Sequence, residues 1–216
     1  MGWNIINKMF LANMKTSPQG YLQLNEFPNV KQVHNDPPIF LVENFLSPAE
    51  CEKIIKMSEN NVKVSHVVDK VTGQGVTHPS RTSQSCYYGY DIKWLVSRVH
   101  RLTGVGQKFQ EPIQVARYLT GQFYQSHLDA LDTDDVKEKG QRIGTVLIYL
   151  NDVKTGGATF FNHLNFRVQP KQGAAVVFFP SKMDGTILDN MLHTAEDASD
   201  TKWVSQIWLR NKQYSN

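Results

Sequence analysis

From about residue 112 onward, the sequence consists of short runs rich in β-branched and aromatic residues, separated by turn residues. The runs span residues 113–119, 143–150, 158–161, 166–168, 174–179 and 203–209. Glycines and prolines stand between them, as is typical of turns. A parallel βαβ arrangement would instead need a helix between successive strands. The pattern therefore predicts an all-β core, built as a sandwich or a jelly roll.

A helix is expected shortly before this β-rich region. Ser47, Pro48 and Glu50 form a helix-start signal, in which the serine caps, the proline occupies the first turn and the glutamate completes a capping box. The helix is expected to run to about Asn60 and to follow a short strand at residues 39–42. Its apolar positions fall roughly on one face, which suits packing against a sheet.

A second helix is expected at residues 91–103. Ile92, Leu95 and Val99 recur at helical spacing, and Gly104 is suited to end the helix. Two helices outside a β-rich C-terminal half favour an α+β fold that is mainly β, with the helices packed on one side of the sheet.

The length and composition indicate one domain. The chain has 216 residues and is 40% hydrophobic, which is enough for a single core. Residues 1–38 mix polar and turn residues with scattered apolar ones and are interpreted as an N-terminal arm or edge segment. Residues 39–216 are expected to form the single domain, in which residues 62–89 hold a strand and a mobile loop.

Charge and cysteine content exclude several classes of protein. With 23 Lys+Arg against 20 Asp+Glu, the net charge of +3 predicts no nucleic-acid partner. Cys51 and Cys86 are too few for a disulfide scaffold and lack a zinc-site spacing. No apolar run approaches the roughly 18 residues of a membrane span, and no secretory signal is evident. The expectation is a cytoplasmic protein without a membrane partner.

His127 and Asp129 are the clearest candidates for chemistry. An imidazole and a carboxylate two residues apart share a face of an extended segment, as two ligands of one metal require. A turn histidine beside a solvated acid is the alternative interpretation of this pair. His193 follows a strand-like run and offers a second imidazole, and two histidines with one carboxylate are typical of non-haem Fe(II) oxygenases. Lys202, at the start of an apolar strand, is placed to bind a carboxylate.

Over roughly residues 38–210 the sequence resembles the prolyl 4-hydroxylase branch of the Fe(II)/2-oxoglutarate dioxygenases, of the microbial or viral type. The central block is Tyr-Leu-Thr-Gly-Gln-Phe-Tyr-Gln-Ser-His-Leu-Asp at residues 118–129. Further matching blocks occur, in the same order, at residues 81–83, 142–160, 170–173, 192–193 and 202–203. The resemblance implies a double-stranded β-helix, or jelly-roll, core.

The resemblance also implies a role for individual residues. The iron ligands and catalytic residues would be His127, Asp129 and His193. Lys202 would bind the distal carboxylate of 2-oxoglutarate, and Tyr118 and Thr159 would help to hold this cosubstrate. The residues on the substrate side would be Tyr124, Arg142, Trp208 and Arg81, the last within a mobile loop that closes over a bound peptide.

The implied activity is that of a procollagen-proline 4-dioxygenase-like enzyme. Fe(II), O2, 2-oxoglutarate and ascorbate would support hydroxylation of peptidyl proline at C4, with 2-oxoglutarate converted to succinate and CO2. Arg210 stands where the animal and plant collagen-type enzymes commonly carry histidine, which argues against a collagen-type substrate. The expected partner is a proline-containing peptide or protein, bound by a monomer or homodimer.

Two alternatives remain open from the sequence. The same cofactors would serve an oxygenase that hydroxylates another side chain, a free amino acid or a small molecule. A β-barrel that binds without turnover would also have this pattern of strands, although the complete set of His127, Asp129, His193 and Lys202 argues against a degenerate site.

Overall fold

The structure, a computed structural model, describes residues 14–69, 74–133 and 136–214. Its largest element is an antiparallel eight-stranded sheet in the order β1-β2-β12-β9-β14-β7-β6-β3. These strands are β1 (Val30–His34), β2 (Ile39–Val42), β12 (Ala175–Phe178), β9 (Arg142–Tyr149), β14 (Lys202–Arg210), β7 (Ile113–Tyr118), β6 (Gln84–Tyr88) and β3 (Lys63–Val64). The strands expected at residues 113–119, 143–150, 174–179 and 203–209 therefore form the centre of this sheet.

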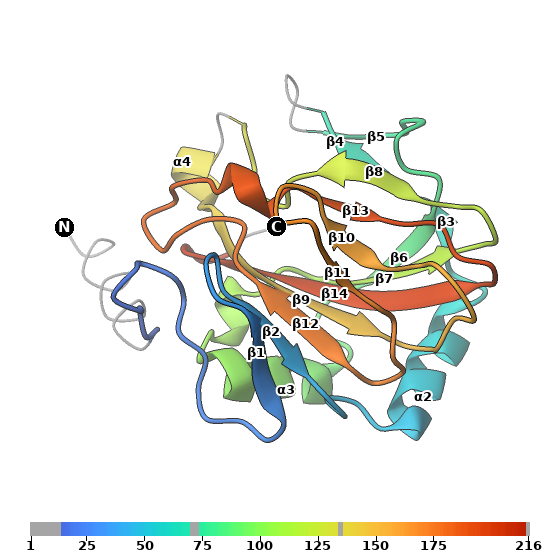
Figure 1. Cartoon of the computed structure of the whole chain (residues 1–216), viewed down its shortest axis with the longest axis horizontal. Coiled ribbons are helices and arrows are strands. Elements are labelled where there is room, and N and C mark those ends of the chain that lie inside the picture. The colour runs from blue at the N-terminus through green and yellow to red at the C-terminus, as the bar shows by residue number, and fades with distance from the viewer. Residues whose placement is uncertain (1–13, 70–73, 134–135, 215–216) are drawn as a thin grey trace.

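A second, four-stranded sheet has the order β11-β10-β13-β8 and lies above the larger sheet in Figure 1. Its strands are β11 (Phe166–Val168), β10 (Thr159–Phe161), β13 (His193–Ala195) and β8 (Tyr124–His127). Phe161 of this sheet packs with Leu147, Phe178 and Val204 of the larger one in a shared apolar cluster. The two sheets thus form the jelly-roll sandwich that the sequence predicted.

The outer face of the large sheet is covered by two helices, α2 (Pro48–Ser58) and α3 (Lys93–Thr103). Ile54 and Leu95 from these helices share a core with Val146 and Ile207 of β9 and β14. Successive residues of a strand point to opposite faces, so each central strand serves both cores. Figure 1 shows both helices on the same side of the sheet, which confirms the expected arrangement.

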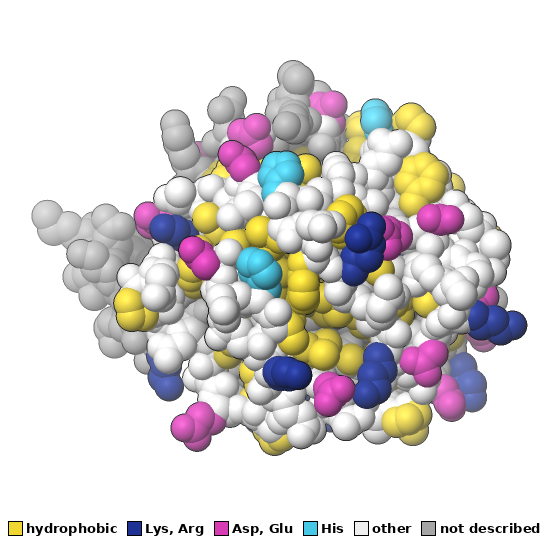
Figure 2. Space-filling view, in the orientation of Figure 1, with side chains coloured by type: hydrophobic (Ala, Val, Ile, Leu, Met, Phe, Trp, Pro, Cys, Tyr) yellow, Lys and Arg dark blue, Asp and Glu magenta, His cyan; other side chains and the backbone are white. Residues whose placement is uncertain are grey.

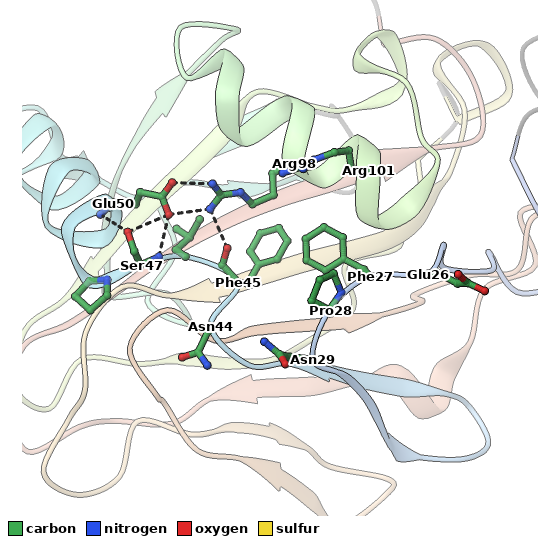
Figure 3. A pocket seen from close by; sticks show the side chains of 12 residues that line it. Glu26, Phe27, Pro28, Asn29, Asn44, Phe45, Ser47, Glu50, Arg98 and Arg101 are labelled. Atoms are coloured by element: carbon green, nitrogen blue, oxygen red, sulfur yellow. Dashed lines mark hydrogen bonds and ion pairs between the residues drawn. The ribbon is translucent and has the colours of Figure 1, made fainter.

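The two helices are tied together by an ion pair (Figure 3). Ser47 caps α2, and the Glu50 carboxylate accepts a hydrogen bond from the Ser47 backbone nitrogen, so the predicted capping box is present. Arg98 of α3 donates to both carboxylate oxygens of Glu50, at 2.7 and 2.8 Å. These residues border a cavity of about 670 Å³ whose lining includes no residue of the histidine and aspartate cluster described below.

Several elements differ from the sequence expectation. Strands β1, β8 and β13 were not predicted, and residues 62–89 hold β3, β4 (Val67–Val68), β5 (Gly75–Val76) and β6 rather than one strand and a loop. Residues 70–73 of that region lie outside the described residues.

The N-terminal segment is partly described, since residues 1–13 of the expected arm lie outside the described residues. Strand β1 pairs with β2 at the edge of the large sheet, and Tyr21 and Leu22 are buried in the helix-side core. The segment therefore contributes an edge strand and core residues, while the domain boundary at residue 38 stays a prediction.

Basic and acidic side chains are interspersed on the face drawn in Figure 2. Among its coloured side chains, lysines and arginines do not gather into one basic patch. Within the described residues, no helix has both the length and the apolar character that crossing a bilayer requires.

Candidate functional site

Three metal-ligating side chains come together where β8 and β13 pair. His127 ends β8, Asp129 follows two residues later, and His193 begins β13 directly opposite His127. Nε2 of His127 lies 3.7 Å from Oδ1 of Asp129, and Nε2 of His193 lies 3.9 Å from its Oδ2. One ligand atom from each residue falls within 4.8 Å of the others, which is the spacing of a shared metal ion.

Hydrogen bonds orient all three groups. Nδ1 of His127 is 2.8 Å from the Gln125 carbonyl oxygen, and Nδ1 of His193 is 2.9 Å from that of Met191. Each ring therefore donates from Nδ1 to the backbone and leaves the Nε2 lone pair facing Asp129. The hydroxyl of Thr145 donates to Oδ2 of Asp129 at 2.7 Å.

The protonation states also suit a divalent cation. Burial, with a further effect of His193, lowers the pKa of His127 to about 3, so its imidazole is neutral at physiological pH. Burial alone would raise the pKa of Asp129. The neighbouring imidazoles, Arg142 and the Thr145 hydroxyl outweigh it, and the pKa of Asp129 lies below its usual range. Two imidazoles and a carboxylate are the donor set of a non-haem Fe(II) site.

A small cavity adjoins the two histidines and holds the other expected cofactor residues. Its lining is Tyr118, Tyr124, His127, Leu147, Thr159, His193, Ala195, Lys202, Val204 and Gln206. Lys202 is 2% exposed, and its Nζ donates to the carbonyl oxygens of Gly157 and Glu196. Burial lowers the pKa of Lys202 to about 8. A mostly charged amine in a buried cavity is suited to bind an anion.

The neighbours of Lys202 come from two strands that face it. Its Nζ lies 4.6 Å from the ring centroid of Tyr118, the residue paired with it across β14 and β7. The hydroxyl groups of Thr159 and Tyr149 share a hydrogen bond of 2.7 Å. Lys202 and Tyr118 belong to the large sheet and Thr159 to the smaller one, and all three line the same cavity, as expected for residues that bind a common ligand.

The expected substrate residues fall into two groups. Tyr124 stacks on His127 with ring centroids 3.6 Å apart, and the Arg81 guanidinium lies 4.7 Å from the Tyr124 ring centroid. Arg81 is buried and donates to Ser83, to Gln114 and to a backbone carbonyl. Its side chain is thus held firmly in this structure, while closure of its loop over a peptide stays a prediction.

The second group is Arg142 with Trp208, on the adjacent strands β9 and β14. The Arg142 guanidinium lies 3.7 Å from the Trp208 ring centroid, and its Nη1 donates to the backbone oxygen of Asp129 at 3.3 Å. Neither residue lines the cavity of Lys202, so they mark a separate region near Asp129.

Sequence reasoning missed three residues of the site. Thr145 orients Asp129, Gln206 lines the cavity, and Glu111 binds Arg142 through two hydrogen bonds. Gln206 shares strand parity with Lys202, and Thr145 with Tyr149, so alternation along β14 and β9 was the signal that could have found them. Glu111 precedes β7 and carries no such signal.

Comparison with known proteins is consistent with this geometry. The sequence model of the 2OG-Fe(II) oxygenase superfamily matches residues 113–210. Two solved structures share the fold: a viral collagen prolyl hydroxylase from Paramecium Bursaria Chlorella virus-1 in complex with 2OG, and a prolyl hydroxylase in complex with a hypoxia inducible factor peptide fragment from Trichoplax adhaerens. The first has a TM-score of 0.59 at 24% identity and covers 80% of this chain and 95% of its own. The second has a TM-score of 0.61 at 19% identity and covers 80% and 83%.

Curated relatives are similar over most of their length. The chain is 33% identical to prolyl 4-hydroxylase 1 of Arabidopsis thaliana over 89% of this chain and 76% of the relative. It is 29% identical to a putative prolyl 4-hydroxylase of Acanthamoeba polyphaga mimivirus over 88% of this chain and 80% of the relative. The chain therefore belongs to the prolyl 4-hydroxylase family of the 2-oxoglutarate and Fe(II) dependent oxygenases.

Proposed function

We propose that this protein is an Fe(II)- and 2-oxoglutarate-dependent dioxygenase that hydroxylates peptidyl proline at C4. The observation that carries the proposal is the buried Lys202 in the same cavity as His127 and His193, with Asp129 beside them. A metal site alone would suit many enzymes, but a buried cation next to it suits a metal-bound dicarboxylate. The names of the curated relatives support proline as the substrate.

In this proposal His127, Asp129 and His193 bind Fe(II) on one side and leave the remaining positions for 2-oxoglutarate and O2. When bound, the metal supplies the oxidative chemistry that converts 2-oxoglutarate to succinate and CO2 and hydroxylates a C–H bond. The residues of the chain orient the reactants. Lys202 binds the distal carboxylate, Tyr118 and Thr159 flank it, and the apolar strands keep water away.

Tyr124 has to move for the cosubstrate to bind. The cavity has a volume of about 30 Å³, which is roughly the volume of one water molecule and too small for a five-carbon dicarboxylate. Tyr124 lines this cavity, and its ring contacts the His127 ring and the Arg81 guanidinium. We expect its side chain to rotate away on binding and then to contact the peptide, together with Arg81, Arg142 and Trp208.

Further parts of the proposal rest on the family resemblance. Ascorbate would keep the iron in its ferrous state between turnovers. The partner would be a proline-containing peptide or protein, bound by a monomer or homodimer, and a cytoplasmic location without nucleic-acid or membrane partners stays a prediction.

The test is a product balance. The protein is incubated with Fe(II), ascorbate, 2-oxoglutarate and a proline-rich peptide, and succinate and hydroxylated peptide are quantified. The proposal predicts equal amounts of both, with the hydroxyl group at C4 by NMR, and loss of both in His127→Ala. The matched control is His163→Ala, because His163 is exposed and outside the site.

Each other outcome has a defined meaning. Succinate without peptide hydroxylation would keep the oxygenase but point to another side chain, a free amino acid or a small molecule. Absence of succinate in iron-loaded protein would contradict the enzyme and favour a β-barrel that binds without turnover.

A further inference from the structure

A buried ionic cluster lies beside the candidate site, made of Glu111, Arg142 and Arg210. Oε1 of Glu111 accepts a hydrogen bond from Nε of both arginines, each at 2.7 Å, and Oε2 accepts a third from Nη2 of Arg142 at 2.8 Å. Glu111 is 8% exposed and Arg210 5%. We refer to these three residues as the Glu111 cluster.

The backbone explains why the three side chains meet. Arg142 begins β9 and Arg210 ends β14, and the two residues are paired across these strands. Glu111 comes just before β7, the neighbour of β14 on its other side, and its backbone nitrogen donates to the Trp208 carbonyl oxygen. One carboxylate is thus placed between the ends of three strands.

The cluster determines where the Arg142 guanidinium lies. Two nitrogens of Arg142 bind Glu111, a third donates to the backbone oxygen of Asp129, and the guanidinium plane stacks on Trp208. Trp208 is itself 7% exposed, and its indole Nε1 has no hydrogen-bond partner among the described residues.

Arg210 differs from Arg142 in what else it contacts. Its Nη1 donates to the carbonyl oxygens of Gly140 and Lys139, in the segment that leads into β9. Among the described residues, Arg210 has no hydrogen bond or ion pair with the three candidate iron ligands, and it does not line the cavity of Lys202. Arg210 and Arg142 donate to the same carboxylate oxygen of Glu111, so both charged donors hold this oxygen in place.

We propose that Arg210 is a positioning residue for the peptide side of the reaction: it holds Glu111, and Glu111 holds Arg142 against Trp208. This inference rests on the proposed function, because it takes Arg142 and Trp208 as residues that contact the bound peptide. It predicts that loss of Arg210 weakens peptide binding and leaves iron and 2-oxoglutarate binding unchanged.

The first experiment compares Arg210→Met with the wild-type protein. The KM for a proline-rich peptide is expected to rise by about 10-fold to 100-fold, because a misplacement of about 1 Å has effects of this size. The iron content and the KM for 2-oxoglutarate are expected to stay at wild-type values. Arg210→Lys, which keeps the charge but only one donor group, is expected to restore part of the loss.

Arg98→Met is the matched control for general destabilisation. Arg98 also binds both oxygens of a glutamate, Glu50, and lies 5.3 Å from a tryptophan ring centroid, that of Trp94. It belongs to the helix layer, so its loss is expected to lower stability without changing the KM for peptide. An equal rise in peptide KM for both variants would contradict the positioning role.

A pH profile separates positioning from simple packing. In Arg210→His the introduced imidazole would face Glu111, Arg142 and the Tyr214 ring, which lies 5.5 Å from the Arg210 guanidinium. An imidazolium binds the Glu111 carboxylate more strongly than a neutral imidazole does, so the peptide KM of this variant should rise as pH increases through about 6 to 7. The ratio of variant to wild-type KM should then depend on pH, which a packing defect would not produce.

A spectroscopic measurement tests the inference independently of turnover. The indole N–H signal of Trp208 is assigned by its disappearance in Trp208→Phe and then followed in Arg210→Met and Arg210→Lys. The expected result is a shift in Arg210→Met similar to that in Arg142→Met, and a smaller one in Arg210→Lys. An unchanged Trp208 signal would overturn the inference even if the protein is an active hydroxylase, and absence of succinate in the wild type would contradict only the proposed function.

Discussion

Thr145 would not bind the metal itself, but it orients Asp129, which would. Its hydroxyl donates to Oδ2 of Asp129 and is buried in β9. Loss of such an orienting hydrogen bond commonly costs 10-fold to 100-fold in metal affinity. Thr145→Val, which keeps the shape, is therefore expected to weaken Fe(II) binding by about 10-fold to 100-fold, as measured by anaerobic equilibrium dialysis.

The control for this substitution is Thr103→Val. Thr103 is also buried and donates to a backbone carbonyl, but it lies in α3. Its substitution is expected to leave the Fe(II) dissociation constant unchanged. Equal Fe(II) affinities of wild type and Thr145→Val would show that the Thr145 hydroxyl does not orient a metal ligand.

Lys202 predicts a pH dependence for cosubstrate binding. Burial lowers the pKa of Lys202 to about 8, so the free amine is charged below that pH and neutral above it. Only the charged form attracts the carboxylate. The KM for 2-oxoglutarate is therefore expected to be constant below pH 8 and to rise by about tenfold per pH unit well above it.

Removing the amine should remove this dependence. In Lys202→Met the KM for 2-oxoglutarate is expected to be raised by about 10-fold to 100-fold at neutral pH, the usual cost of a charged hydrogen bond. The same variant should show no further rise around pH 8. A wild-type KM that stays flat well above pH 8 would be inconsistent with Lys202 as the carboxylate partner.

The sequence indicated the residues whose chemistry is distinctive, and it missed those that act through another residue. His127, Asp129, His193 and Lys202 could be proposed from residue type and spacing, and the structure brings them together. Glu111 could not be proposed in this way. It binds two arginines that lie far along the chain and come close to it only because three strands pair.

At the scale of elements, the start of α2 depends on Ser47. Its hydroxyl accepts a hydrogen bond from the Glu50 backbone nitrogen, and Glu50 in turn binds Arg98 of α3. Replacing a capping serine by alanine commonly costs about 1 kcal/mol. Ser47→Ala is expected to lower the free energy of unfolding by about this amount, measured by urea denaturation.

Ser97→Ala serves as the comparison. Ser97 is an exposed residue in the middle of α3, where alanine has the higher helix propensity. Its substitution should leave stability unchanged or slightly raised. A similar loss of stability in both variants, or none in Ser47→Ala, would mean that the cap does not stabilise α2.

Strands with their own apolar pattern were predictable, and strands that depend on their neighbours were not. The run at residues 166–168 and that at 39–42 match β11 and β2, and the helix expected at residues 91–103 begins two residues later, at Lys93. In contrast, β8 has the polar sequence YQSH and β13 has only three residues. These two strands form because they pair with each other and, through β13, with β10.

At the scale of the whole molecule, the large sheet separates a structural side from a reactive side. Trp203 lies in the core shared with the helices, whereas Trp208, on the same strand, stacks under Arg142. Residues 203 and 208 differ in parity along the strand, so the two tryptophans face opposite sides of the sheet. The sequence indicates an arm or edge segment over residues 1–38 but does not locate β1 within it, since the pairing of β1 with β2 leaves no local pattern.

The central claim is that the three ligands and Lys202 form one site that binds Fe(II) and 2-oxoglutarate together. The most direct measurement is an anaerobic calorimetric titration of 2-oxoglutarate into the protein with and without Fe(II). We expect one binding site for 2-oxoglutarate that requires Fe(II), is lost in His127→Ala, is retained in His163→Ala and is weakened in Lys202→Met. Equal 2-oxoglutarate binding with and without Fe(II), or unchanged binding in His127→Ala, would contradict it.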